Sequence, residues 1–278
     1  MSTESIPDSH DLEPRCLVDL DADHPGFRDA GYRARRDQIA RIALDHRPGE
    51  PVPDAPYTRD EQDVWKAIWR RLSPLHARLA CTELQSLQEE LGLERGDIPQ
   101  LAALNAELEP RTGFRMEPVA GLVLARDFLL SLGRGIFLST QYIRHASRPF
   151  YTPEPDVVHE AVGHAASLTH AGIAELSRAF GRATIDADES RLEQLIHVYW
   201  YTLEFGVVEE DGQPRALGAG LLSSVGELDQ LRDGPQLLPW DLERMAATGF
   251  EPTAFQPALF VAPSLDVLLG EVRDWLRD

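Results

Sequence analysis

Residues 151–164 read YTPEPDVVHEAVGH and place two histidines, His159 and His164, five positions apart. The continuation DVVHEAVGHAASLTH predicts a helix that begins near Pro155, because proline is tolerated in a first helical turn. Asp156 in that turn suits the positive end of the helix dipole. On an α-helix, residues five apart lie about 140° apart around the axis, wider than the i, i+4 pair of zinc proteases. Such a pair can bind one metal ion if the helix bends or a third ligand comes from elsewhere.

A candidate third ligand lies in the segment IHVYWYTLEFG at residues 196–206. Glu204 is the one acidic residue of this aromatic and apolar run, and a carboxylate in such surroundings is costly unless it is paired or binds a metal. Two neutral histidines and one carboxylate on one face of an iron ion leave three positions open, as in non-haem Fe(II) oxygenases. We therefore predict that His159, His164 and Glu204 bind iron. The alternative is that one histidine is merely a hydrogen-bonded core residue.

Length, charge and cysteine content bound the class of protein. The 278 residues suffice for one large domain or two small ones. The net charge of −19, from 27 basic and 46 acidic residues, argues against nucleic acid or an anionic membrane surface as the main partner. No stretch approaches the roughly 20 consecutive apolar residues of a transmembrane helix, and the polar, acidic N-terminus does not resemble a signal peptide. Cys16 and Cys81 provide no disulfide framework, which favours a reducing cytoplasm.

Periodicity and capping signals predict a mostly helical α+β fold. We expect residues 1–17 to form a disordered tail and residues 18–278 to form one domain. Three predicted helices are given by their start: one begins at Thr58, with a capping box to Glu61, one at Ser73-Pro74 and one near Pro155. The others are expected within residues 24–46, near Asp127, at about 172–182, at about 189–205 and within the final SLDVLLGEVRDWLRD. Asp211-Gly212 predicts a tight hairpin turn, and FQPALFVA predicts a closing strand.

Several long motifs resemble the pterin-dependent aromatic amino acid hydroxylases, the family of phenylalanine, tyrosine and tryptophan hydroxylases. The motifs are DLDADHPGFRDAGYRARRDQIARIA, DIPQL, TGFRMEPVAGLVLARDFL, STQYIRHASRPFYTPEPDVVHEAVGH, YWYTLEFGV, GAGLLSSVGEL and FQPALFVA. They cover residues 18–278 and correspond to the catalytic domain of the phenylalanine hydroxylase type. The resemblance implies many helices with small β-hairpins around an iron site, and neither a regulatory nor a tetramerisation domain. We therefore expect a monomer.

The resemblance also implies a role for individual residues. His159, His164 and Glu204 match the iron ligands. Arg144 matches the arginine that holds the substrate carboxylate, and Asp156 is positioned to brace it. The remaining substrate positions match Thr152, Pro155, Trp200, Phe205, Gly220 and Ser223.

The positions around the pterin match Val119, Gly121, Leu122, Phe128, Leu129, Glu160 and Tyr199. Among them, Phe128 matches the aromatic side chain that stacks on the pterin, and Glu160 is expected to assist oxygen activation. By resemblance, Fe(II) and a tetrahydropterin activate dioxygen, with one oxygen atom transferred to the pterin and the other to the substrate ring. Leu138 and Ala125 replace polar residues of other members. We therefore expect the cofactor to be either tetrahydrobiopterin or a bacterial analogue of it. Independently of the cofactor, the arginine-rich composition, with Lys66 as the single lysine, suggests that the protein comes from a GC-rich bacterium.

The resemblance favours phenylalanine, hydroxylated at the para carbon to tyrosine. Tryptophan 5-hydroxylation and phenylalanine 3-hydroxylation stay open, because Pro252 occupies a loop position where family members that use different substrates carry different residues. A rival from another class is a zinc peptidase, since HEAVGH fits an H-E-x-x-G-H pattern in which Glu160 is the general base. The segments before and after HEAVGH do not belong to that pattern. A non-catalytic protein that binds a pterin or an amino acid is the third alternative.

Overall fold

The computed structural model describes residues 20, 22, 24–94, 96–152 and 154–277, so the predicted tail lies outside the described residues. The α-helices are α1 (Ala30–Asp45), α2 (Arg59–Leu79), α3 (Thr82–Glu90), α4 (Leu101–Thr112), α5 (Ala125–Gly133), α6 (Ala166–Leu168), α7 (Ala171–Thr184), α8 (Glu189–Tyr199), α9 (Ala219–Ser223), α10 (Val225–Asp229), α11 (Leu242–Ala246) and α12 (Leu265–Trp275). Two segments are π-helical, η1 (His159–Ala165) and η2 (Trp200–Glu204). The strands are β1 (Arg115–Pro118), β2 (Ile136–Ser139), β3 (Val207–Glu210), β4 (Gln213–Ala216), β5 (Gln236–Pro239) and β6 (Ala258–Ala262).

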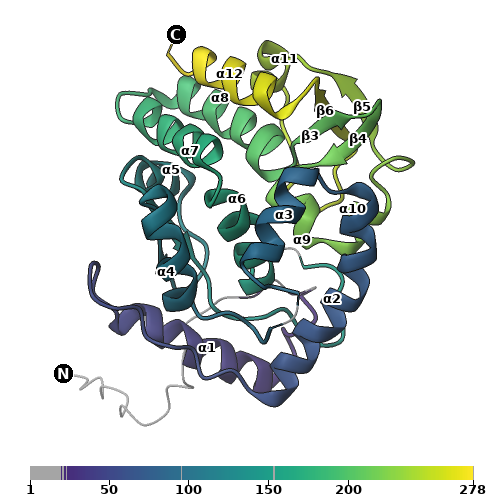
Figure 1. Cartoon of the computed structure of the whole chain (residues 1–278). Coiled ribbons are helices and arrows are strands. Elements are labelled where there is room, and N and C mark those ends of the chain that lie inside the picture. Colours follow the sequence, from purple (N-terminus) through teal and green to yellow (C-terminus); the bar gives the residue numbers. More distant parts are fainter. Residues whose placement is uncertain (1–19, 21, 23, 95, 153, 278) are drawn as a thin grey trace, which may run out of the picture.

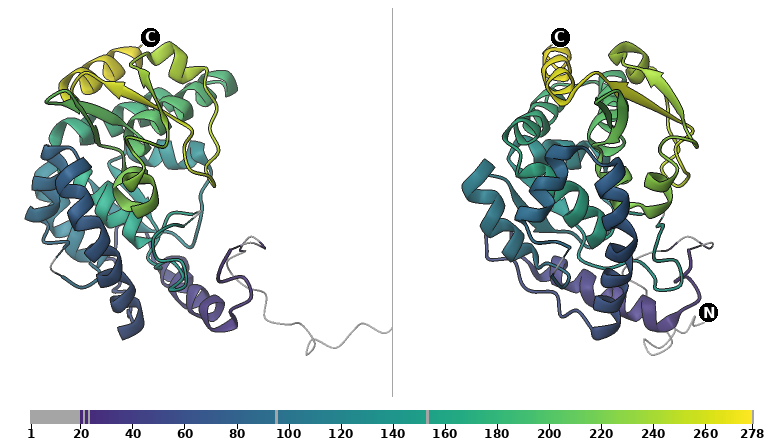
Figure 2. Two further views of the ribbon diagram at one scale, coloured as in Figure 1. Left: turned by 90° about the vertical axis from the view of Figure 1, so that its right-hand side faces the viewer. Right: turned by 45° about the vertical axis from the view of Figure 1, so that its right-hand side comes forward.

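The predicted mostly helical α+β class is confirmed. Most helices surround a central segment, which consists of η1 and α6. Helix α1 crosses one end of the molecule, whereas α12 and the sheet that contains β3 and β6 occupy the opposite end (Figures 1 and 2). Helix α6 lies in the middle, directly after η1 (Figure 1). Together η1 and α6 pack against α3, α4, α7 and α9. The motif that contains the two predicted histidine ligands is therefore enclosed by helices from both halves of the chain.

The core is built from large apolar side chains that are completely buried. Among them are Trp65, Phe114, Phe137, Phe180 and Phe260. Burying one such side chain contributes about 1.5–3 kcal/mol relative to leaving it in water. The elements that position the functional residues thus rest on a well-packed interior.

Helix α2 begins where its sequence predicts but ends later than predicted. The side chain of Thr58 accepts a hydrogen bond from the N–H of Glu61, and the Glu61 carboxylate accepts one from the N–H of Thr58, so the capping box is confirmed. The predicted restart at Ser73-Pro74 is wrong, because α2 continues through Pro74 to Leu79. Proline inside a helix forfeits one backbone hydrogen bond. The buried stripe of α2 continues on both sides of Pro74, and this burial outweighs the loss.

The strands form a four-stranded sheet in the order β4-β3-β6-β5 and a separate pair, β1 with β2. Among the described residues, only β3 and β4 form a hairpin, through Asp211 and Gly212 with φ angles of 52° and 69°. Positive φ at both central residues defines the tight turn that Asp-Gly favours, so the predicted hairpin is confirmed. The predicted closing strand is β6, which pairs in parallel with β3 and β5. The sheet is therefore mixed rather than a set of hairpins.

Strands β1 and β2 pair in parallel and are connected by α5, which packs closely on α7. Two glycines permit this approach, Gly133 at the end of α5 and Gly181 within α7. A Cβ atom on residue 181 would lie 2.1 Å from the backbone nitrogen of Gly133 and 2.4 Å from its Cα atom. Both are backbone atoms, which cannot rotate away. Glycine at position 181 thus sets the distance between the two helices.

We expect Gly181→Ala to destabilise the protein, because the new methyl group forces α5 away from α7. Overpacking of this kind costs about 1–3 kcal/mol, and for a chain of this size each 1 kcal/mol lowers the melting temperature by roughly 2–4 °C. The matched control is Gly270→Ala in α12, where a Cβ atom meets nothing within 4 Å. That variant should be as stable as the unmodified chain or slightly more stable. Thermal unfolding of both variants checks this; a melting temperature for Gly181→Ala equal to that of the control would contradict it.

Candidate metal centre and active-site pockets

The two predicted histidine ligands lie on η1, a π-helix where the sequence predicted an α-helix. In a π-helix the backbone hydrogen bonds run between residues i and i+5, so residues five apart follow one another by about one turn on the same face. The wide angular separation expected for His159 and His164 therefore does not arise. Their ring centroids are 4.7 Å apart, and their Nε2 atoms are 2.9 Å apart. The local helix geometry itself brings the pair together.

The third predicted ligand, Glu204, is the last residue of η2, which continues α8 without interruption. The N–H of Phe205 donates to the carbonyl oxygen of Trp200 at 2.7 Å, a hydrogen bond across five residues. The helix predicted over 189–205 is thus present, but its final turn is π-helical. Two π-helical turns, from segments about forty residues apart, supply all three predicted ligands.

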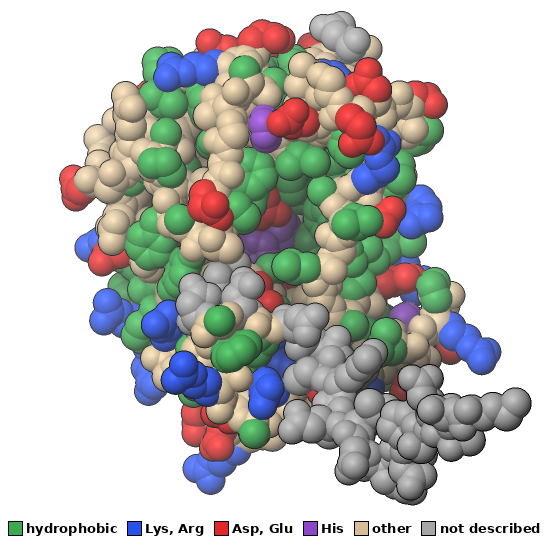
Figure 3. All heavy atoms as spheres, turned by 180° about the vertical axis from the view of Figure 1, so that it is seen from behind, with side chains coloured by type: hydrophobic (Ala, Val, Ile, Leu, Met, Phe, Trp, Pro, Cys, Tyr) green, Lys and Arg blue, Asp and Glu red, His purple; other side chains and the backbone are tan. Residues whose placement is uncertain are grey.

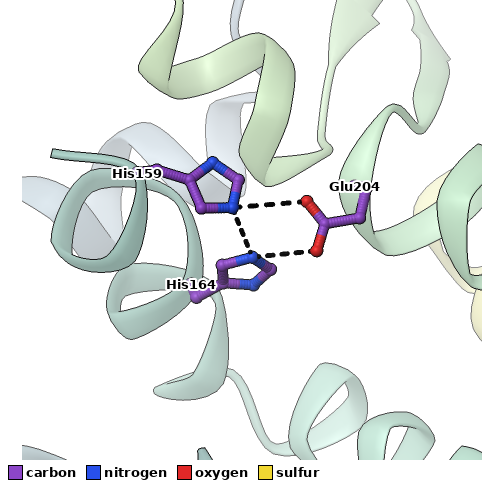
Figure 4. A group of neighbouring side chains, drawn as sticks. All are labelled: His159, His164 and Glu204. Carbon is purple, nitrogen blue, oxygen red and sulfur yellow. Dashed lines mark hydrogen bonds and ion pairs between the residues drawn. The ribbon is translucent and has the colours of Figure 1, made fainter. Parts of the chain in front are cut away.

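The three side chains converge on one point (Figure 4). Nε2 of His164 lies 3.0 Å from Oε1 of Glu204, and Nε2 of His159 lies 3.4 Å from Oε2. One ligand atom from each residue lies within 4.8 Å of the other two. Metal ligands of this kind bind at about 2.0–2.2 Å, so donor atoms of one ion lie at most about 4.4 Å apart. The spacing fits a single metal ion with small side-chain adjustments.

The protonation of the three groups is set by burial and by their proximity. Burial raises the pKa of Glu204, but the two histidines outweigh this effect and bring it below its ordinary value. Burial lowers the pKa of His164. For His159, burial is outweighed by the Glu204 carboxylate, and the pKa is raised. Since histidine binds a metal in its neutral form, the raised pKa of His159 means that metal binding at this site weakens as the pH falls through that pKa.

Neighbouring groups fix the orientation of His159. Its Nδ1 atom lies 3.1 Å from the hydroxyl of Ser223, and its backbone N–H donates to Oδ1 of Asp156 at 3.2 Å. A partner on Nδ1 orients the ring and directs Nε2 toward a metal. Two imidazoles and one carboxylate, with open space beside them, are the donor set of non-haem Fe(II) oxygenases. The three side chains therefore form a candidate metal centre with the donor set of this class.

Two pockets border the predicted ligands. The larger of these two, called the larger pocket, has a volume of about 320 Å³ and opens beside His159 and Glu204. Figure 3 shows a hollow on this face with histidine and acidic side chains at its floor and mainly hydrophobic side chains around it. Most of the predicted substrate residues line the larger pocket, namely Arg144, Thr152, Pro155, Trp200, Phe205, Gly220 and Ser223. Asp156 does not reach the wall, because it is completely buried against Arg144. This is the bracing position predicted for it.

Arg144 is held so that part of its guanidinium stays available. Its Nε and Nη2 atoms donate to the two carboxylate oxygens of Asp156 at 2.9 and 2.7 Å, and its Nη1 atom donates to the backbone carbonyl of Ser223 at 3.2 Å. Although burial raises the pKa of Asp156, Arg144 brings it below its ordinary value, so the pair is ionised. A guanidinium has five N–H groups, and these contacts use three. One N–H on each of Nη1 and Nη2 can therefore bind a carboxylate in a two-pronged contact.

A second pocket of about 180 Å³, the smaller pocket, is lined by all three predicted ligands. Of the predicted pterin residues, the structure places five on its wall: Val119, Gly121, Leu122, Phe128 and Glu160. It does not place Leu129 or Tyr199 there. Leu129 is buried in the core, and the Tyr199 ring packs edge-on against Phe128 with centroids 5.7 Å apart. Tyr199 therefore supports the wall from behind through Phe128.

Glu160 is a buried carboxyl group that faces the smaller pocket. Burial raises its pKa to about 7, although His159 and the hydrogen bonds from Thr140 act in the opposite direction. The N–H and the hydroxyl of Thr140 both donate to Oε1 of Glu160 at 3.0 Å. A polar group fixed in this way can accept or donate a hydrogen bond at the edge of a planar ring.

Sequence reasoning missed several residues that line the two pockets. In the larger pocket these are Tyr151, Glu154, Ser224, Glu227, Thr253 and Ala254, and in the smaller pocket Val123, Phe137 and Thr140. Most come from loops or from short helices that carry no periodic pattern. The one signal that points to them is that they lie within or next to the motifs that carry the family resemblance.

Comparisons with known proteins identify the family of this chain. The model of the family described as biopterin-dependent aromatic amino acid hydroxylase matches residues 10–278. Phenylalanine-4-hydroxylase of Rattus norvegicus is 44% identical over 261 residues, which are 92% of this chain and 58% of that protein. Tyrosine 3-monooxygenase of Mus musculus is 42% identical over 274 residues, which are 97% of this chain and 54% of that protein. The chain thus spans little more than half of the length of these relatives.

Solved structures show the same fold. Phenylalanine hydroxylase from Chromobacterium violaceum, with bound iron(III) and oxidised 7,8-dihydrobiopterin, is 28% identical with a TM-score of 0.76, over 86% of this chain and 90% of that chain. Phenylalanine hydroxylase from Legionella pneumophila is 30% identical with a TM-score of 0.73, over 81% of this chain and 95% of that chain. The chain belongs to the biopterin-dependent aromatic amino acid hydroxylase family. Membership of this family rules out the zinc peptidase alternative.

Proposed function

We propose that this chain is an Fe(II)- and tetrahydropterin-dependent monooxygenase that hydroxylates free L-phenylalanine to L-tyrosine. The observation that carries the proposal is that two pockets with different linings share predicted metal ligands in their walls. His159, Glu204, Pro155 and Leu122 line both the larger and the smaller pocket. A substrate in the larger pocket and a cofactor in the smaller pocket would both lie next to the same ion. The relatives named as phenylalanine hydroxylases support the choice of substrate.

The larger pocket is suited to a free aromatic amino acid. Arg144 presents two N–H groups to a carboxylate, and the aromatic wall begins at Trp200 and Phe205, whose ring centroids are 4.6 Å apart. Trp200 is fixed by stacking on Phe250 with centroids 3.9 Å apart and planes within 7°. Its Nε1–H donates to Oε1 of Gln256 at 3.0 Å. A rigid wall of this kind orients the substrate ring toward the metal and excludes water from it.

The residues around the smaller pocket suit a tetrahydropterin. His159, His164 and Glu204 would hold Fe(II), Phe128 would stack on the pterin ring, and Glu160 would hydrogen-bond to its edge. When bound, iron and pterin supply the activation of dioxygen that amino acid side chains cannot supply. The chain's own part is to align substrate, metal and cofactor. Tetrahydrobiopterin or a bacterial analogue fits this wall, where Leu138 and Ala125 offer no polar side chain.

The substrate proposal is tested by competition among L-phenylalanine, L-tyrosine and L-tryptophan with Fe(II), tetrahydropterin and dioxygen. We expect phenylalanine to be consumed first and tyrosine to be its product. Mass spectrometry with chromatographic standards identifies the position of the new hydroxyl group. 5-Hydroxytryptophan or meta-tyrosine as the main product would replace the proposed specificity by one of the alternatives within the family. An absence of any hydroxylated product would contradict the proposed activity.

We also propose a mainly monomeric protein in a reducing cytoplasm, with residues 18–278 as one catalytic domain. The net charge of −19 opposes self-association, and Cys81 is a buried free thiol. None of the described helices combines the length and the apolar character needed to span a bilayer. Light scattering at micromolar concentration should give the mass of one chain, 31.0 kDa. A stable dimer or tetramer would contradict the monomer.

A further inference from the structure

Glu227 is an acidic residue in the wall of the larger pocket and is not one of the predicted metal, substrate or pterin residues. It lies in α10 and is only 8% exposed. The N–H of Gln256 donates to its Oε1 atom at 3.3 Å. Gln256 is itself fixed, because its side chain accepts from Trp200 and donates to the backbone carbonyls of Glu251 and Ala254. The carboxyl group of Glu227 is therefore held by a tightly bonded loop.

This carboxyl group has no cationic partner among the residues that the structure describes. Burial raises its pKa to about 7, and the Gln256 N–H only partly offsets that effect. Asp156 shows the contrast: it is more deeply buried, yet Arg144 keeps it ionised. A buried carboxylate without a counter-charge is costly. Its presence in a ligand pocket points to a cationic group that arrives with the ligand.

The position of Glu227 relative to Arg144 indicates which cation this is. Nη1 of Arg144 donates to the backbone carbonyl of Ser223, four residues before Glu227, so the two charged groups belong to neighbouring parts of one wall. A free amino acid carries its carboxylate and its ammonium group on the same carbon atom. The wall of the larger pocket thus contains one cationic fork and one carboxyl group that has no cationic partner among the described residues. This arrangement matches both charges of a zwitterion.

We propose that Glu227 accepts a hydrogen bond from the α-ammonium group of the substrate and so selects free α-amino acids over aromatic acids without an amino group. The inference rests on the proposed function, because it takes Arg144 as the group that binds the substrate carboxylate. In this role Glu227 is a positioning residue. It fixes the second polar end of the amino acid and thereby the direction in which the ring points. Charge-assisted contacts of this type are among the stronger hydrogen bonds.

The test compares two ligands that differ only in the ammonium group. Binding of L-phenylalanine and of 3-phenylpropionate to the iron-loaded full chain is measured by calorimetry, for the unmodified protein and for Glu227→Gln. We expect Glu227→Gln to weaken phenylalanine binding by about 10- to 100-fold and to change 3-phenylpropionate binding by less than about twofold. The matched control is Asp229→Asn, which removes a carboxylate from the exposed side of the same helix. It should bind both ligands normally.

Other outcomes would overturn the inference. Equal phenylalanine affinity in Glu227→Gln and the unmodified protein would show that the ammonium group is bound elsewhere. A parallel loss for both ligands would show that Glu227 only supports the loop around Gln256. If Glu227→Gln fails to fold, Glu227→Asp serves instead, because it retains the charge but shortens its reach; selective weakening of phenylalanine binding is again expected. Hydroxylation by the unmodified protein is measured in parallel, and its absence would refute the proposed function rather than the role of Glu227.

Discussion

Alanine at any one of the three predicted ligand positions is expected to remove most of the bound iron and all hydroxylation. His159, His164 and Glu204 each contribute one donor atom to a group in which every atom lies within 4.8 Å of the others. Loss of one donor leaves two, which is too few to hold Fe(II) against water at ordinary concentrations. The fold should survive, because the three side chains line the smaller pocket and are not among the apolar side chains of the main core.

Iron content and hydroxylation rate, measured on the same preparations, check this expectation. Far-ultraviolet circular dichroism establishes that each variant is folded. The matched control is His46→Ala, which removes a histidine that lines neither pocket. It should retain iron and activity. Normal iron and full activity in any one of the three ligand variants would remove that residue from the metal centre.

Arg144→Ala is expected to impair substrate recognition without affecting the metal. Arg144 is 3% exposed and bonded to the completely buried Asp156, and it has two N–H groups left for a carboxylate. Removing one partner of a buried charged contact typically costs about 2–5 kcal/mol. At about 1.4 kcal/mol per tenfold change, kcat/KM should fall roughly 30-fold to several thousand-fold. Iron content should stay near that of the unmodified protein, because Arg144 is not a ligand.

Arg144→Lys distinguishes charge from geometry at the same position. A lysine ammonium keeps the charge but cannot reproduce the planar, two-pronged contact. Its kcat/KM should therefore lie between those of the unmodified protein and Arg144→Ala. In both variants, pterin oxidation is expected to exceed product formation, because a loosely held ring is no longer aligned with the metal. Normal phenylalanine binding by Arg144→Ala would show that the substrate carboxylate is held elsewhere.

The sequence predicted those elements whose signals are local. The capping box of Thr58 with Glu61 and the Asp211-Gly212 turn each depend on residues within a few positions, and both are present. The continuation of α2 through Pro74 was missed, because it depends on burial against distant parts of the chain. The general class of fold followed from periodicity and from the family resemblance.

The predicted ligands were brought together, but the reason for their convergence was not foreseen. A pair such as His159 and His164 looks too widely spaced when an α-helix is assumed. Hydrogen bonds across five residues replace the α-helical pattern over His159–Ala165, and within this segment Gly163 packs so closely on α9 that a Cβ atom would lie 2.5 Å from the Cβ atom of Ala219. Nothing in the local sequence announces it. Glu227 was missed for a similar reason, because only the folded loop around Gln256 shows that its carboxyl group faces the pocket.

The most direct test of the account follows the oxygen atom. The iron-loaded chain is incubated with tetrahydropterin and L-phenylalanine under ¹⁸O-labelled dioxygen in unlabelled water, and the product is analysed by mass spectrometry. We expect tyrosine with one ¹⁸O atom in its ring hydroxyl group, and no product when iron or pterin is omitted. Unlabelled tyrosine, or no tyrosine from a folded preparation that contains iron, would contradict it.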